Sequence, residues 1–94
     1  MLLDDNSYQL EKVNIDRRVL VMIMVLSAIK RNDKCRIKSV VGGGNARKRI
    51  YELGLNTGAE VKMVKNDFGP IIISLSGHKL AIGRGLAQHI FVEK

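Results

Sequence analysis

The chain has 94 residues, 46% of them apolar, which suits one compact domain with a single core and is too short for two. The 16 lysine and arginine residues outnumber 9 aspartate and glutamate residues, and the formal net charge of +7 favours an acidic partner such as a protein face, nucleic acid or anionic lipid. The single cysteine excludes an internal disulfide, which favours a reducing, cytoplasmic compartment. With no Trp, two Tyr and two Phe, the chain is poor in the stacking platforms that single-stranded nucleic acid requires.

Residues 1–18 are polar, mixed in charge and without a sustained apolar period, so we expect a poorly ordered arm. The block 19–26 is apolar throughout, and it suits a buried strand and a short buried helix equally well. This apolar stretch is bounded by Arg18 and Lys30 and is too short to cross a bilayer. No small-residue cleavage pattern follows it, which argues against a secretion signal.

Residues 35–40 alternate in the two-residue period of a half-buried strand. Its inner face is expected to hold Cys35, Ile37 and Ser39, and its outer face Arg36, Lys38 and Val40. Three glycines, residues 42–44, then break the strand.

A short helix is predicted to begin after Asn45, a favoured N-cap residue, and to run to Leu53. Gly54 suits the left-handed position just past a helix. Leu55 can then pack back on Ile50, which is the hydrophobic contact of a Schellman motif.

The rest of the chain predicts a β-meander with short turns. The expected elements are strands at 59–65, 70–75 and 78–83, a two-residue hairpin turn at Ser76 and Gly77, one helical turn at 84–88, and a last strand at 89–94. The predicted fold class is therefore all-β: a small five-stranded closed barrel with one short helix between its first two strands, since closure removes exposed strand edges.

Three segments resemble the FeoA family, ferrous iron transport protein A: GGGNARKRIYELGLNTGAEV, GPIIISLSG and LAIGRGLAQHIFV. The matching positions are 42–44, Arg47, Arg49, 52–55, Gly58, 69–71, Ala87, Ile90 and Val92. The likeness covers about residues 26–94, which we expect to form the domain, with residues 1–25 as an N-terminal extension. The family often has Pro at Asn56 and Thr57, and residues 1–21 have no family counterpart.

The resemblance implies an SH3-like barrel, located in the cytoplasm, that assists the membrane ferrous iron transporter FeoB. The soluble part of that transporter is a guanine-nucleotide-binding domain, and it is the partner that the resemblance implies. The resemblance implies no catalysis and no cofactor. Because the same fold occurs in metal-dependent repressors, a nucleic-acid-binding or repressor-type module is the alternative function.

Arg47, Lys48 and Arg49 are expected in the first turn of the helix, where the helix dipole disfavours cations. A cluster that breaks this rule predicts a docking surface for an acidic patch, although a solvated charged face is an equally good explanation of the charges alone. The candidate partner-binding residues are Arg47, Arg49, Glu52, Leu53, Gly54 and Leu55.

Other kinds of site have little support. The glycine run lacks the GxxxxGK[ST] pattern of a phosphate-binding loop. Cys35, His78 and His89 match no metal-site spacing, and Cys35 is expected in the core. No Cys-His or carboxylate pair has catalytic context, so we expect neither an enzyme nor a metal centre. If the barrel closes without block 19–26, that block needs cover, which predicts a homo-oligomer.

Overall fold

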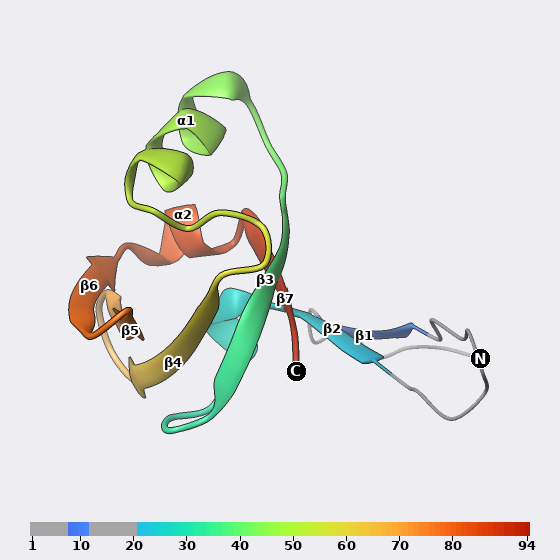
Figure 1. Cartoon of the computed structure of the whole chain (residues 1–94), viewed down its shortest axis with the longest axis vertical. Helices are drawn as coiled ribbons and strands as arrows, with labels where there is room; N and C mark the ends of the chain where they lie inside the picture. Colours follow the sequence, from blue (N-terminus) through green and yellow to red (C-terminus); the bar gives the residue numbers. More distant parts are fainter. Residues whose placement is uncertain (1–7, 12–20) are drawn as a thin grey trace.

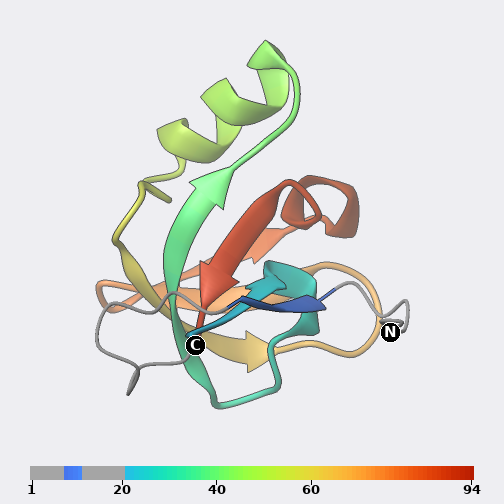
Figure 2. The ribbon, with the colours of Figure 1, turned by 90° about the vertical axis from the view of Figure 1, so that its right-hand side faces the viewer.

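The computed structural model describes residues 8–11 and 21–94. In this part the elements are, in order, β1 (Tyr8–Glu11), β2 (Val21–Val25), the 3-10 turn η1 (Leu26–Ala28), β3 (Lys34–Val40), α1 (Gly44–Glu52), β4 (Glu60–Lys65), β5 (Ile71–Leu75), β6 (His78–Ile82), α2 (Arg84–Ala87) and β7 (Ile90–Glu93) (Figure 1). Helix α1 projects above the sheet, and β2 lies between β1 and β7 (Figure 2).

All strand pairs are antiparallel, in the order β1-β2-β7-β3-β4-β5-β6. The five strands predicted between residues 35 and 94 are all present, with one short helix between the first two, so the all-β, SH3-like fold class is confirmed. The one detail that differs is closure, because the described sheet ends at β1 on one side and β6 on the other. Strand β7 pairs with β3 on one side and with β2 on the other. The sheet therefore continues to β2 and β1 instead of closing by pairing with β6.

Block 19–26 becomes a strand over its described residues, β2, rather than a helix. The expectation of a poorly ordered arm is wrong for residues 8–11, which form β1 and pair with β2; residues 1–7 and 12–18 of that arm lie outside the described residues. The side chains of Ile23, Val25 and Leu26 are 8% exposed or less. These three side chains are covered within the chain and do not themselves require a second copy. Met22 is exposed, and residues 19 and 20 lie outside the described residues, so the homo-oligomer stays a prediction.

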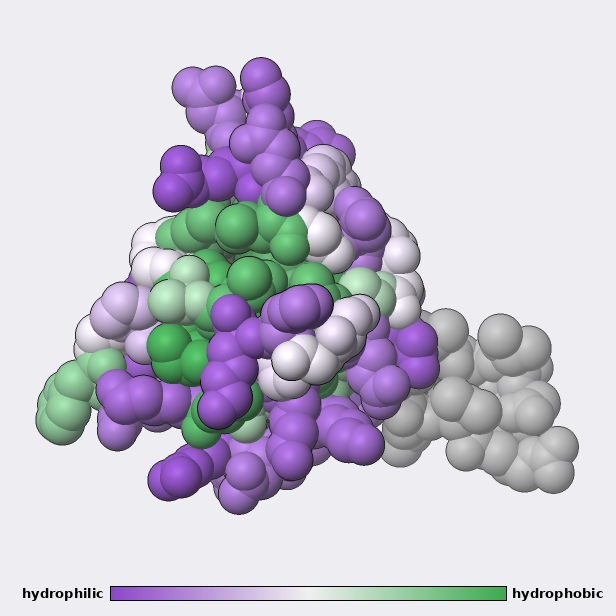
Figure 3. All heavy atoms as spheres, turned by 60° about the vertical axis from the view of Figure 1, so that its left-hand side comes forward, coloured by the Kyte–Doolittle hydropathy of each residue, from purple (hydrophilic) through white to green (hydrophobic). Residues whose placement is uncertain are grey.

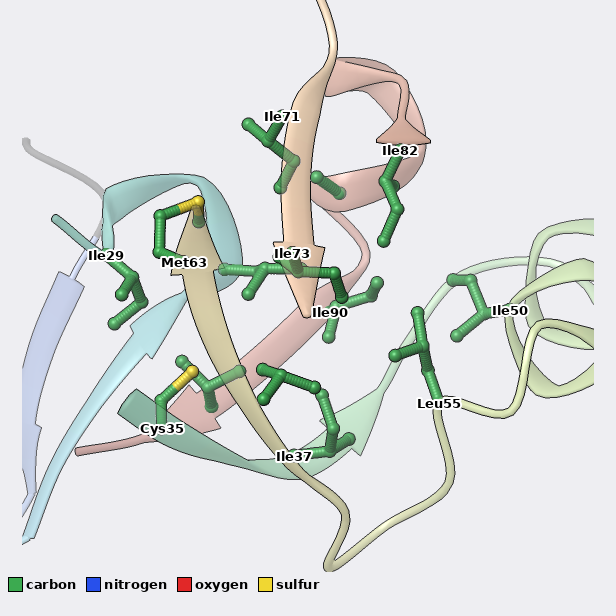
Figure 4. Packing of buried hydrophobic residues seen from close by; sticks show 14 of the residues in the cluster. Ile29, Cys35, Ile37, Ile50, Leu55, Met63, Ile71, Ile73, Ile82 and Ile90 are labelled. Atoms are coloured by element: carbon green, nitrogen blue, oxygen red, sulfur yellow. The ribbon is translucent and has the colours of Figure 1, made fainter. Parts of the chain in front are cut away.

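One apolar core holds the sheet together. It gathers branched side chains from every strand from β3 to β7, as predicted for the inner faces of half-buried strands (Figure 4). Its fully buried members include Ile37, Val61, Ile71, Ile73, Ile82, Ile90 and Val92. The described residues contain no buried charged or polar side chain, so hydrophobic burial is the main stabilising term.

The alternation of β3 changes phase at a β-bulge. Ile37 pairs with Val92, but the next pair along β7 joins Phe91 to Ser39, so β3 holds one extra residue there. After the bulge Val40 is buried and Ser39 is exposed. The expectation that Ser39 faces inward and Val40 outward is therefore wrong, because one inserted residue reverses every later side chain.

Helix α1 begins at Gly44, two residues earlier than predicted. Its N-cap is Gly43 and Asn45 lies inside the helix, so the prediction that Asn45 caps it is wrong. Its end matches the prediction: Gly54 has φ of 91° and donates to the Tyr51 carbonyl oxygen, while the Leu55 N–H donates to the Ile50 carbonyl oxygen. These two bonds form a Schellman motif.

In the turn from β3 to α1, position 42 requires a glycine. Its φ is +108°, and a Cβ atom at this position would lie 2.5 Å from Nδ1 of His89. The neighbouring Val41 N–H donates to the His89 carbonyl oxygen at 2.8 Å, which holds the two segments together. Gly44, in contrast, has no heavy atom within 4 Å of the equivalent point.

We expect Gly42→Ala to lower the free energy of unfolding by at least ~1–2 kcal/mol, because a residue with a Cβ atom is strained by about that much in a left-handed backbone conformation. The clash of the new Cβ atom with His89 adds to this cost. Gly44→Ala is the matched control. Its free energy of unfolding should be unchanged or raised by up to about 1 kcal/mol, because Gly44 lies in α1 and alanine has a higher helix propensity than glycine. Urea unfolding of both variants measures the difference. Equal stability of the two variants would contradict this account of the turn.

Candidate functional site

A hollow of about 430 Å³ lies between the end of α1 and the β5–β6 hairpin. We call it the leucine groove, and its lining residues are Leu53, Gly54, Ala59, Leu75, Ser76, His78 and Leu80. The three leucines and Ala59 pack against the core from its outside and keep part of their surface open to solvent. Hydrophobic residues are exposed on this face, below the hydrophilic end of the molecule that α1 forms (Figure 3).

The groove exists because the sheet is open at β6. Leu75 pairs with His78 across a two-residue hairpin turn in which Ser76 and Gly77 both have positive φ, as predicted for this turn. Leu80 faces the same side as the core residue Ile73, with which it pairs. In the described sheet no further strand follows β6, and of its inner side chains Ile82 is fully buried whereas Leu80 is partly exposed in the groove with Leu53.

The end of α1 forms the opposite wall of the groove. Leu55 is fully buried and supports the wall from the core, so it has no surface to offer a partner. Ile50 is buried beside it, and the two side chains lie next to each other in Figure 4. The Schellman turn thereby leaves Leu53 and Gly54 half-buried at the groove. Gly54 lies close to Leu75, since a Cβ atom added to it would lie 3.4 Å from Leu75 Cδ2.

The charged candidate residues line the exposed side of α1. Arg47, Arg49 and Glu52 are all exposed. Arg49 lies four residues before Leu53, so the two residues are on the same side of the helix. The prediction that all three cations occupy the first turn is wrong: Arg49 belongs to the last turn, where the helix dipole favours a cation.

The structure thus places Leu53 and Gly54 in one groove, with Arg47, Arg49 and Glu52 on the adjoining helix. Sequence reasoning missed Ala59, Leu75 and Leu80, because their pattern is that of ordinary inward strand residues. The sequence did contain a signal for Leu75. It is the last residue of a predicted strand, immediately before the turn residues Ser76 and Gly77, and a side chain at a strand end has fewer neighbours to bury it.

The three soft or imidazole side chains lie in different surroundings. Cys35 is in the core, His78 is exposed at the groove and His89 packs against Gly42. Across residues 8–11 and 21–94, no three His, Cys, Asp or Glu side chains are grouped so as to hold a metal ion. Within those same ranges no helix is long and apolar enough to span a membrane.

Burial raises the pKa of the Cys35 thiol to about 11, and the negative charge of Asp33 adds to the effect. A thiol with a raised pKa holds its proton at neutral pH and is a poor nucleophile. Cys35 therefore acts as a small core residue, as its position on β3 predicts.

Comparisons with known proteins agree with this fold. The model of the FeoA domain family matches residues 24–94. A protein of Methanocaldococcus jannaschii named as an Fe(2+) transport protein A is 40% identical over 68 residues, which cover 72% of this chain and 83% of that protein.

The crystal structure of an iron uptake regulatory protein (FeoA) superposes with a TM-score of 0.73 at 37% identity, and the match covers 78% of this chain and all of that one. A manganese-dependent transcriptional repressor superposes with a TM-score of 0.69 at 15% identity, over 74% of this chain and 40% of that protein. The second likeness concerns the fold alone, since small β-domains of one fold serve unrelated functions.

We expect the Cys35 thiol to resist a thiol-specific reagent at pH 8 in the folded protein and to react fully in denaturing urea. Burial keeps the reagent away from the sulfur and raises the pKa of the thiol, so little of the reactive thiolate forms. Since the folded pKa exceeds the unfolded one, the contribution of Cys35 to stability is complete below about pH 9 and declines as the pH rises towards 11. Absorbance of the released reagent group measures the reaction. Rapid modification of the folded protein would place Cys35 at the surface instead.

Proposed function

This chain belongs to the FeoA family, and on that premise we propose that it is a cytoplasmic accessory protein of ferrous iron uptake that binds the soluble nucleotide-binding domain of the transporter FeoB. The leucine groove is the observation that carries this proposal. An apolar hollow with a charged margin is the usual form of a surface that receives an anchoring side chain from another protein.

The proposed contact combines burial with charge. An apolar side chain of the transporter domain enters between Leu53 and Leu80. These two leucines are only partly buried in the free protein, and the contact buries the rest of their apolar surface. Carboxylates around that side chain face Arg47 and Arg49, whose guanidinium groups bind carboxylates in a planar, two-pronged geometry. The protein acts by binding and performs no catalysis of its own.

The nucleic-acid-binding alternative has weaker support. Of the aromatic residues in 21–94, Tyr51 and Phe68 are the exposed ones, and they lie on α1 and on the β4–β5 turn respectively. Single-stranded nucleic acid binds through several neighbouring aromatic platforms. Titration of DNA and RNA at several salt concentrations tests this alternative, which predicts a steep loss of affinity with salt for any sequence.

We expect Leu53→Asp to weaken binding to the purified transporter domain by more than about tenfold, because a carboxylate cannot be desolvated in an apolar groove without a partner. The Arg47→Ala, Arg49→Ala double variant should weaken binding by about tenfold at low salt and by less at high salt, because exposed charges are screened. Isothermal titration calorimetry measures both effects.

Arg31→Ala is the matched control, since Arg31 is an equally exposed cation before β3, remote from the groove, and its removal should leave the affinity unchanged. Circular dichroism establishes that each variant is folded. If folded Leu53→Asp binds the transporter domain as tightly as the wild type does, the groove is not the docking site.

A further inference from the structure

The turn between β4 and β5 holds an aromatic side chain out in solvent. Phe68 is 87% exposed. The other large apolar side chains exposed in the described residues, Met22, Val41 and Tyr51, are 38% to 43% exposed. A phenyl ring so fully hydrated is available for burial against another surface.

Hydrogen bonds fix this turn in place. The Phe68 N–H donates to the Asp67 carboxylate at 2.7 Å, and Arg84 donates to the Asp67 carbonyl oxygen at 2.6 Å and to the Asn66 side-chain oxygen at 2.9 Å. Asn66 in turn donates to the carbonyl oxygens of Ser27 and Ile29, at 2.9 and 2.7 Å. The exposed position of Phe68 is therefore set by the fold, and little conformational freedom is left to lose on binding.

Cations surround this turn. The Asn66 bonds bring it against the end of η1, and the Asn32 N–H donates to the Met63 carbonyl oxygen, so the segment before β3 and the turn after β4 lie at the same end of the sheet, away from α1 (Figure 1). The exposed cations of this end are Lys30, Arg31, Lys34, Lys62 and Lys65. We call these five residues together with Phe68 the basic tip.

The carboxylates near the basic tip neutralise only part of its positive charge. Asp33 pairs with Lys94 at 2.6 Å and Asp67 pairs with Lys65 at 2.9 Å. Lys34 and Lys62 lie directly opposite each other on β3 and β4, an arrangement that disfavours folding because like charges repel. Glu60 lies two residues before Lys62, at the start of β4, where it is opposite Arg36. An anionic partner would relieve this concentration of positive charge.

We propose that the basic tip docks onto the surface of an anionic lipid bilayer, with Phe68 entering the interface and the surrounding cations contacting lipid headgroups. The tip has one highly exposed aromatic side chain and five exposed cations, which fits an anionic membrane surface. A nucleic acid would require more than one aromatic platform at the tip. The contact is peripheral, and no segment has to cross the membrane.

This proposal is independent of the one for the leucine groove. Phe68 lies before Ile71, at the end of β5 opposite to Leu75 of the groove. Lys62 of the basic tip pairs with Ser74, next to Leu75, but successive strand residues point to opposite faces, so Lys62 and Leu75 lie on opposite faces of the sheet. A protein docked through the groove would leave the tip free to contact a bilayer.

The test is co-sedimentation of the full chain with vesicles of phosphatidylglycerol and phosphatidylcholine, compared with vesicles of phosphatidylcholine alone, without any transporter present. We expect binding to the anionic vesicles, weakened by added salt, and about tenfold weaker binding for Phe68→Ala. Because the chain has no tryptophan, Phe68→Trp provides a single reporter, whose emission should shift to the blue when the side chain enters the interface.

Tyr51→Ala is the matched control, because Tyr51 is an exposed aromatic residue on α1, and this variant should bind vesicles as the wild type does. Arg31→Ala should weaken vesicle binding, in contrast to its expected lack of effect on transporter binding. Three results would each overturn the proposal: equal vesicle binding by Phe68→Ala and wild type, an unshifted tryptophan emission in the Phe68→Trp variant, or loss of transporter-domain binding in Phe68→Ala without any vesicle binding by the wild type.

Discussion

The burial of Ile50 and Leu55 in the core is the contact on which the rest of the structure depends. Helix α1 contributes Ile50 as its one fully buried side chain, and the Schellman turn that follows directs Leu55 into the same core. Leu53, which is partly buried, adds a further apolar contact between this end of the helix and the core. The turn also leaves Leu53 at the surface, so the interaction that anchors the helix also forms one wall of the groove.

The open edge of the sheet leaves apolar side chains of this small domain partly uncovered. A barrel closed by hydrogen bonds would cover the inner side of β6, whereas here Leu75 and Leu80 stay partly open to solvent. The described core contains no buried ionisable side chain other than the protonated thiol of Cys35. The partly exposed apolar side chains at the open edge are the ones available for burial against another molecule.

Most of the fold was accessible from local sequence. The Schellman turn at Gly54 and the hairpin turn at Ser76 follow from backbone conformations that these residue types favour, and both were predicted. Which side chains of β3 point inward after Ile37 was not predicted, because a β-bulge depends on the pairing partner rather than on the strand's own residues. Of the site, Leu53 and Gly54 were predicted from family motifs, but the strand residues opposite them were not, since their pattern also suits a covered core.

The sequence by itself determined which residues are apolar and which turns are possible, and therefore the number and order of the strands from Cys35 onwards. Those choices depend on neighbours within a few residues, and so they can be read locally. Only the tertiary structure decided that the sheet stays open at β6, that β2 extends it beyond β7, and that Phe68 projects from a fixed turn. These features depend on contacts between segments far apart in the chain, and no local pattern records which edge of a sheet is left without a partner.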